Sequence, residues 1–383
     1  MNFSNINNNQ FNINKLNVRY CNSDNDFKNY ISYSLANYLQ VIKEELVNYE
    51  TSWDVYKKYT NVYEYIHTNV PMQKYSISKF KPLSRAFFKF IEIVHRYKLV
   101  ENYNETNIKT FHLAEGPGGF IQAISHIRKN SNDKYYGMTL INEQNKNIPG
   151  WKKSERFLNE NKNVFIERGR DKTGDLLNHT NLQHNYDKYK NSMNIITGDG
   201  GFDFSSDFNK QEVHSSLLIL GQIFHALILQ KRGGSFVLKI FDIFHKITID
   251  CIYLLTYFYE NIEICKPQTS RTGNSEKYII CKNFKYNDTT FLLEKFKEIL
   301  KNAKGRYVTS IIKDNISLYF LNKIEDVNIN YGFKQINVIQ NTINLINNKN
   351  IEKINTMINN NVIQCITWCK THELEYNNFT NLN

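Results

Sequence analysis

A glycine-rich turn is the first feature of the sequence that could support chemistry. Residues 111–120 read FHLAEGPGGF: a short apolar run ends at an acid, and apolar residues return at helical spacing after the turn. The candidate cofactor-contacting residues of this turn are Glu115, Gly116, Pro117, Gly118, Gly119 and Phe120. Glycines allow the backbone to approach a ligand that a Cβ atom would block.

The spacing of the turn restricts the kind of cofactor. It has neither the G-x-G-x-x-G pattern of a pyrophosphate site nor the GK[ST] ending of a P-loop. An acid without a lysine suits a cationic cofactor that carries no phosphate, and S-adenosylmethionine (SAM) is such a molecule. A plain strand-to-helix turn is the alternative.

Other charged residues stand near the ends of apolar runs. Asp199 follows the run 193–197 and precedes two glycines, so we expect its carboxylate in a cleft. Lys239 is the one charge in the run 235–240, where burial disfavours an ammonium group. An edge lysine that extends into solvent is the alternative. Asp175, in a Thr-Gly-Asp-Leu segment, could lie on the adenine side of a cofactor, whereas the pattern of its own helix predicts a solvated Lys89.

These residues need a framework, and the pattern between residues 110 and 285 supplies one. Strands and helices alternate there, which favours a single α/β sheet in which ligands lie beyond the carboxyl ends of the strands. The predicted strands are 111–114, 135–140, 164–166, 193–197, 235–240, 262–266 and 277–282. Residues 1–25 are Asn-rich, and we expect them to be flexible. We expect a helical N-terminal region at 26–80, the α/β domain at 81–285 and a helical C-terminal region at 286–383.

Composition narrows the class of partner. The formal net charge is +11, which favours a polyanion, with nucleic acid ahead of an anionic membrane surface. No apolar run reaches the length of a membrane span, and the N-terminal residues lack the pattern of a secretory signal. The six scattered cysteines indicate reduced thiols. Cys365, Cys369 and His372 lack a fourth ligand nearby, so we expect no metal.

Four charged residues occur in the same order along the chain as the catalytic residues of a known enzyme family. Lys89, Asp199, Lys239 and Glu276 together are similar to the Lys-Asp-Lys-Glu tetrad of the FtsJ-type RNA ribose 2′-O-methyltransferases. The chain most resembles the mRNA cap 2′-O-methyltransferases of eukaryotes and large DNA viruses. The matching segments are RAFFK at 85–89, AEGPGGF at 114–120, GDGG at 198–201, LKIFD at 238–242 and SRTGNSEKY at 270–278. The match covers roughly residues 80 to 285, and five motifs in order are far more specific than one.

The resemblance implies a fold, a cofactor and a reaction. It implies a Rossmann-like SAM-dependent methyltransferase sheet with helices on both faces, to which helical N- and C-terminal regions are added. SAM would bind at the turn, with Asp175 and Asp199 as further contacts. Lys239 would be the general base, with a pKa lowered by burial and by nearby positive charge. Asp199 and Glu276 would orient Lys239 and Lys89 and offset their positive charge, and the step needs no metal.

The resemblance also leaves alternatives. The expected substrate is the cap-proximal nucleotide of mRNA, with other capping or transcription proteins as further partners and a cytoplasmic location (host cytoplasm or virion if viral). The same chemistry on ribosomal or transfer RNA is the second reading. A non-catalytic RNA-binding or scaffold subunit is the third, although such a module has no need of a lysine in a buried strand. A nicotinamide dehydrogenase is weaker, because the dinucleotide spacing is absent.

Overall fold

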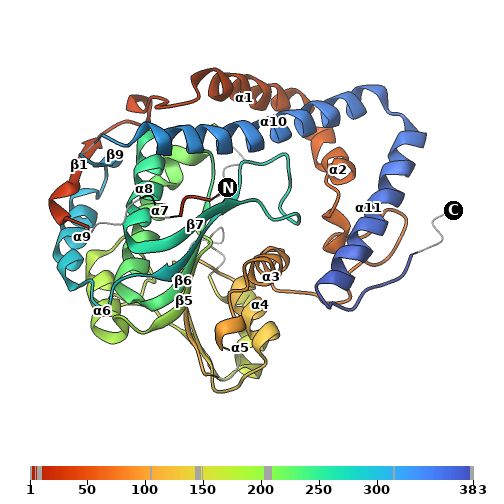
Figure 1. The fold of residues 1–383 in the computed structure, drawn as a ribbon. Helices are drawn as coiled ribbons and strands as arrows, with labels where there is room; N and C mark the ends of the chain where they lie inside the picture. The colour runs from red at the N-terminus through yellow and green to blue at the C-terminus, as the bar shows by residue number, and fades with distance from the viewer. Residues whose placement is uncertain are drawn as a thin grey trace.

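A seven-stranded mixed sheet forms the centre of the molecule (Figure 1). The computed structural model describes residues 2–4, 6, 11–103, 106–142, 148, 150–201, 209–313 and 315–379. The strands in spatial order are β4 (Val164–Ile166), β3 (Lys134–Met138), β2 (Lys109–Leu113), β5 (Met193–Gly198), β6 (Gln230–Ile240), β8 (Lys277–Phe284) and β7 (Tyr259–Cys265). The first five are parallel, and β8 runs antiparallel to both of its neighbours.

The chain reverses its direction across the sheet between β2 and β5. From β2 it proceeds outward through β3 to β4, and it then returns to β5 and proceeds the other way to β6. The last residues of the two central strands lie side by side, with Leu113 paired to Gly198. In an open α/β sheet the crevice at such a switch point is the usual ligand site.

Helices cover both faces of the sheet, so the predicted fold class is confirmed. One face carries α3 (Ala86–Tyr97), α4 (Gly119–Arg128) and α5 (Glu155–Glu160), and the other carries α6 (His179–Tyr189), α7 (Gln211–Leu229), α8 (Lys246–Phe258) and α9 (Thr290–Asn302). Strand side chains alternate between the two layers: Val237 belongs to the first core, whereas Phe236 and Leu238 belong to the second. By length and composition α7 could cross a membrane, but 83% of its most apolar window is buried inside the protein.

The segments before and after the sheet pack on each other. They contain β1 (Leu16–Cys21), α1 (Tyr33–Glu45), α2 (Glu50–Thr60), β9 (Tyr307–Ile312), α10 (Leu318–Asn348) and α11 (Ile351–Thr371). Short 3₁₀ helices are η1 (Ile13–Lys15), η2 (Asp24–Asp26), η3 (Leu46–Tyr49), η4 (Glu64–Ile66), η5 (Glu101–Tyr103) and η6 (Lys152–Ser154). Helix α1 lies along α10, and α2 contacts both α10 and α11 (Figure 1).

Two terminal expectations differ from the structure. The Asn-rich segment 1–25, for which we expected flexibility, contains β1, and the C-terminal region expected to be helical contains β9. The two strands pair antiparallel, with Leu16 opposite Ile312 and both side chains buried. Asp250 of α8 accepts hydrogen bonds from the backbone of Ile311 and Ile312 at 2.9 and 3.1 Å, which fixes the ribbon to the domain.

Candidate active site

The glycine-rich turn is held from within by its acid. Glu115 is buried; its Oε1 accepts the N–H groups of Phe120 and Ile121 at the start of α4, and its Oε2 lies 3.2 Å from Nδ1 of His112. Burial raises the pKa of this carboxyl, and His112 opposes the shift. Glu115 therefore shapes the turn and caps α4.

The other predicted cofactor residues of the turn have different structural roles. The Phe120 ring is fully buried and stacks on Phe90 with 4.4 Å between ring centroids, so its side chain belongs to the core. Gly118 has φ +101°, a conformation that L side chains rarely adopt. A cofactor contact at this turn would therefore come from the backbone of 116–119.

Asp199 and Lys239 meet at the carboxyl ends of β5 and β6. The N–H of Asp199 donates to the carbonyl of Leu113 at 3.2 Å, which places Asp199 beside the glycine turn. Nζ of Lys239 lies 3.3 Å from Oδ1 of Asp199 and donates to its backbone carbonyl at 2.7 Å. Tyr278, opposite Lys239 in the β6–β8 register, donates its hydroxyl to Oδ1 of Asp199 at 3.1 Å.

Lys89 and Glu276 form a second pair. Nζ of Lys89 lies 2.7 and 2.8 Å from the two carboxylate oxygens, and Ser270 donates its hydroxyl to Oε1 at 2.7 Å. The helix pattern predicted a solvated Lys89, and that expectation was wrong: the residue is buried, since the loop before β8 covers it. Burial lowers the pKa of Lys89, and the Glu276 carboxylate opposes this shift.

The structure brings all four of these residues to one edge of the sheet. The charges of Asp199 and Lys239, as well as that of Glu276, affect the pKa of Lys89. Burial acts to raise the pKa of the Glu276 carboxyl, but Lys89, Lys239 and Lys266 outweigh it and hold that pKa well below its usual range. Two ammonium groups and two carboxylates, drawn from α3, β5, β6 and the start of β8, thus balance one another beside the switch point.

Asp175 lies in the loop that follows β4. It is half-buried there, and its Oδ1 accepts the N–H of Leu177 at 2.8 Å. That loop is tied to the segment after β3 by a bond of 2.7 Å from the N–H of Ile141 to the carbonyl of Thr173. Its place on the adenine side of a cofactor stays a prediction.

Several supporting residues were not found from the sequence. Glu92, one turn after Lys89 on α3, accepts the N–H of Gln268 at 2.7 Å and that of Thr269 at 3.2 Å. It therefore fixes the loop that leads to Glu276. The only local signal was a carboxylate three residues after a lysine, which is the ordinary pattern of a solvated helix face.

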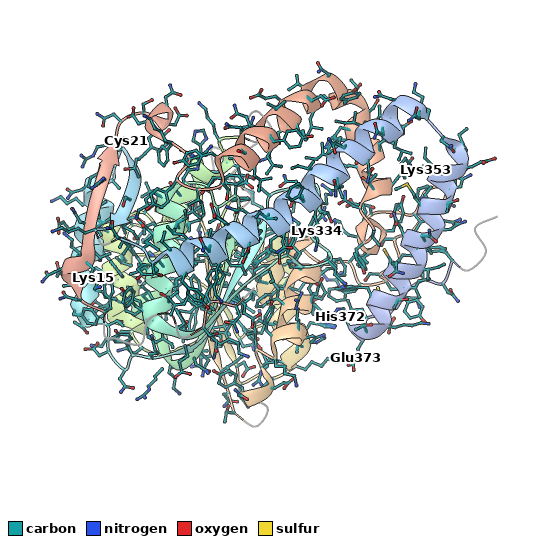
Figure 2. The ribbon with its side chains drawn as sticks, turned by 45° about the horizontal axis from the view of Figure 1, so that its top comes forward. Lys15, Cys21, Lys334, Lys353, His372 and Glu373 are labelled. Atoms are coloured by element: carbon teal, nitrogen blue, oxygen red, sulfur yellow. The ribbon has the colours of Figure 1, made fainter. Side chains whose placement is uncertain are left out.

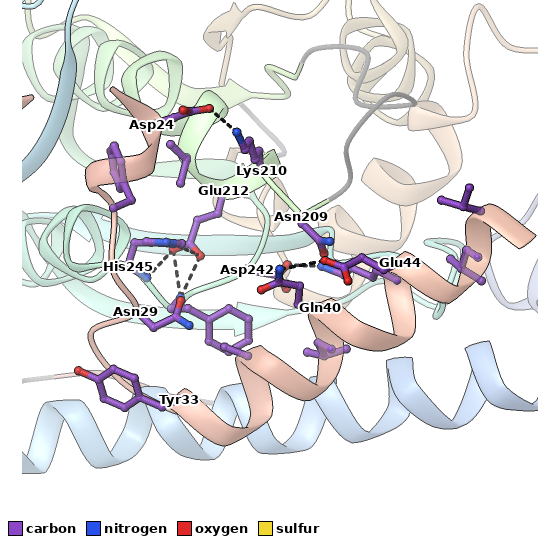
Figure 3. A pocket seen from close by; sticks show the side chains of 18 of the residues that line it. Asp24, Asn29, Tyr33, Gln40, Glu44, Asn209, Lys210, Glu212, Asp242 and His245 are labelled. Atoms are coloured by element: carbon purple, nitrogen blue, oxygen red, sulfur yellow. Dashed lines mark hydrogen bonds and ion pairs between the residues drawn. The ribbon is translucent and has the colours of Figure 1, made fainter. Parts of the chain in front are cut away.

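A further groove is lined by none of the four charged residues of the candidate active site (Figure 3). It has a volume of about 1120 Å³ and lies between α1, the residues around η2 and the segments that flank β6 and α7. Four lysines and six carboxylates line it: Lys28, Lys43, Lys57, Lys210, Asp24, Glu44, Glu50, Asp54, Glu212 and Asp242. Its net charge of −2, from four positive and six negative groups, does not suit an RNA backbone.

The cysteines and the three possible metal ligands are placed as follows. All six cysteines are free thiols. Cys365 and Cys369 are buried in a hydrophobic core, where burial raises both thiol pKa values. His372 turns its Nδ1 to Nδ1 of His95 at 2.9 Å. No group of three or more metal-ligating side chains occurs in the part of the chain that the structure describes.

Comparisons with known proteins give one matching family model and several curated relatives. The family model of the FtsJ-like methyltransferases matches residues 82–284, which is more than half of the chain. A cap-specific mRNA (nucleoside-2′-O-)-methyltransferase 2 from Drosophila melanogaster is 29% identical over 244 residues, covering 58% of this chain and 33% of the relative. The protein of the same name from Danio rerio is 28% identical over 278 residues, covering 68% and 36%.

A related protein type gives a shorter match. The cap-specific mRNA (nucleoside-2′-O-)-methyltransferase 1 of Mus musculus is 34% identical over 193 residues, covering 47% of this chain and 22% of the relative. The chain thus spans about a third or less of the length of these curated relatives.

Proposed function

The chain belongs to the FtsJ-like methyltransferase family, and on that premise we propose that it methylates the ribose 2′-oxygen of RNA, with SAM as methyl donor and the cap-proximal nucleotide of mRNA as substrate. One observation carries the proposal. Nζ of Lys239 is held by Asp199 beside the buried Lys89–Glu276 pair, next to a glycine turn at the switch point of the sheet.

The crevice fits the cofactor. Glycines stand at the ends of both central strands, at 116, 118, 198 and 200, so backbone lines the space where a ligand would lie. Asp199, beside the turn, and Asp175, in the loop after β4, are the carboxylates proposed to contact the cofactor. When bound there, SAM would supply an electrophilic methyl group on a positively charged sulfur.

Lys239 is the group best placed to accept the proton of the ribose hydroxyl. It comes from a rigid buried strand, and two oxygen atoms of Asp199 fix its Nζ. As the new O–CH₃ bond forms and the C–S bond breaks, the hydroxyl proton would pass to the neutral amine form of Lys239, and the sulfur would leave as an uncharged thioether. Its orientation and that of the RNA supply much of the rate, because the transfer is in-line. Lys89, Asp199 and Glu276 keep the charge of the site balanced throughout this step.

The cap as the recognised feature rests on the names of the relatives, which are cap-specific mRNA methyltransferases. The test uses matched capped and uncapped RNAs with labelled SAM, followed by nuclease digestion to locate the methylated nucleotide. Label on the 2′-oxygen beside the cap, on capped RNA alone, is the expected result. Label on uncapped RNA as well would show that the enzyme recognises an RNA target other than the cap. Failure to bind SAM would contradict the proposed enzymatic function.

A further inference from the structure

A second, positively charged cleft opens beside the candidate active site. It has a volume of about 190 Å³ and lies between η4, the start of α3, the loop 267–272 and α10. Two arginines and two lysines line it: Arg85, Lys266, Arg271 and Lys334. Glu64 is the one carboxylate among its described lining residues.

One buried carboxylate holds both arginines in place. Glu64 is 3% exposed, and Arg271 donates to it through Nε at 2.9 Å and Nη2 at 2.6 Å. Nη1 of Arg85 lies 3.7 Å from the same carboxylate, and its Nη2 donates to the carbonyl of Thr269 at 3.1 Å. A guanidinium fixed in this way presents its remaining donors in a defined direction.

The charge of the cleft is not balanced by its own residues. Arginine stays protonated in proteins, so Arg85, Arg271 and the exposed Lys334 face a single carboxylate. Lys266 donates only to uncharged oxygens, the carbonyls of Asn274 and Glu276 and the amide oxygen of Asn274, at 2.7–2.8 Å. A structural ion-pair network would need further acids here, and the described lining supplies none.

The arginine donors remain accessible. Each of the two arginine side chains is 28% exposed, and among the described residues no acceptor takes Nη1 of Arg271. Lys334, on α10, is exposed at the rim (Figure 2). An oxyanion that entered the cleft would therefore find a forked donor, with an ammonium group at the rim.

The cleft adjoins the four charged residues of the active site. Arg85 lies one helical turn before Lys89, and Arg271 is in the loop that delivers Glu276. Ser270, which precedes Arg271 in the chain, donates its hydroxyl to Glu276 at 2.7 Å and so ties the loop of the cleft to the active-site carboxylate. Glu64 lies outside the segment matched by the family model, so the N-terminal addition supplies the anchor of the cleft.

We propose that this cleft binds a phosphate of the RNA backbone close to the methylated ribose and so sets the register of the strand. The proposal rests on the proposed function for the identity of the ligand as RNA. The structural anchor is Glu64, the ligand-facing groups are Arg271 and Arg85, and Lys334 widens the positive field at the rim.

The test measures affinity for a single-stranded RNA of about 12 nucleotides by fluorescence anisotropy over a range of salt concentrations. Each lost phosphate contact should reduce the slope of log affinity against log salt by about 0.7 for a single strand. We expect that reduction for Arg271→Gln and for Lys334→Gln. Lys334→Gln should leave the fold intact, because Lys334 lies exposed on a helix. Arg232→Gln is the matched control, because it removes an exposed arginine at the opposite, amino end of β6.

A modified RNA makes the test specific for position. In a set of RNAs that each carry one uncharged methylphosphonate linkage, one linkage should weaken binding by the wild type several-fold and have little effect on Arg271→Gln. Equal salt slopes for all three variants, or equal sensitivity of wild type and Arg271→Gln at every linkage, would overturn the phosphate site. If the wild type does not bind RNA, both the phosphate site and the proposed function are wrong. If it binds RNA but transfers no methyl group, the phosphate site stands and the proposed reaction is wrong.

Discussion

Tyr278 and Lys239 share one oxygen of Asp199. The tyrosine hydroxyl donates to Oδ1 at 3.1 Å, and the lysine Nζ lies 3.3 Å from the same atom. The two residues face each other across the β6–β8 pairing, so the sheet register itself sets this arrangement. Tyr278 thus restrains the carboxylate that in turn holds Lys239.

Removal of that hydroxyl should slow turnover without loss of the cofactor. For Tyr278→Phe we expect kcat to fall by about 10- to 150-fold, because a hydrogen bond to a charged group contributes about 1.5–3 kcal/mol. The measurement is methyl transfer at saturating SAM and RNA. Tyr259→Phe is the matched control, because it also loses a buried tyrosine hydrogen bond, to Gln230, but outside the site. Equal kcat losses in the two variants would show that Tyr278 has only a structural role.

Lys239 itself should be indispensable for the reaction. Lys239→Ala should reduce methyl transfer to background and leave SAM binding, measured by calorimetry, largely intact. The reason is that the lysine is the proposed proton acceptor, whereas the cofactor contacts come from the turn and the carboxylates. Near wild-type turnover in this variant would eliminate the assigned role.

The buried pair of Lys89 and Glu276 makes a prediction about stability. Each side chain keeps only 10–11% of its surface exposed, so Lys89→Met leaves a carboxylate uncompensated and should destabilise the fold by about 3 kcal/mol. The double variant Lys89→Met with Glu276→Gln should recover part of that loss in urea unfolding and still lack turnover. A double variant that is less stable than either single one would contradict this account of the pair.

The contact between His95 and His372 makes stability depend on pH. Burial lowers the pKa of both rings, and that of His372 falls to about 4, with the neighbouring His95 as a further cause. The unfolded chain then binds more protons than the folded one below pH 6.5, so stability falls as the pH decreases from 6.5 towards 4. Over this range the melting temperature of the wild type should drop more than that of His372→Asn. Equal decreases of the melting temperature with pH in the wild type and in His372→Asn would show that the histidine pair does not cause the acid sensitivity.

The sequence predicted those parts of the site that depend on local pattern. A glycine turn after an apolar run, and an acid or a lysine at the tip of one, are visible over a few residues, and the structure places Gly118, Asp199 and Lys239 around one crevice. Lys89 was misjudged because helical periodicity describes one helix alone, whereas the loop that covers this lysine lies 187 residues later.

Long-range partners explain the other differences. The contact between Glu64 and Arg271 joins residues 207 positions apart, and neither has a neighbour in the sequence that indicates the other. The strand β1 was missed for the same reason, because an Asn-rich segment forms a strand here only through its pairing with β9. Composition describes what a segment prefers in isolation, and these segments are ordered by tertiary contact.

The pairing of β1 with β9 also limits the order in which parts of the protein can fold during synthesis. Thr309 of β9 hydrogen-bonds to the carbonyl of Arg19, 290 residues earlier in the chain. During synthesis, β1, α1 and α2 therefore leave the ribosome long before their partners exist. The central sheet can assemble in the meantime, and the N-terminal addition can close over it only after residues 307–348 have emerged. The pairing of β1 with β9 and of α1 with α10 thus makes the emergence of residues 307–348 a precondition for the N-terminal segments to reach their final positions.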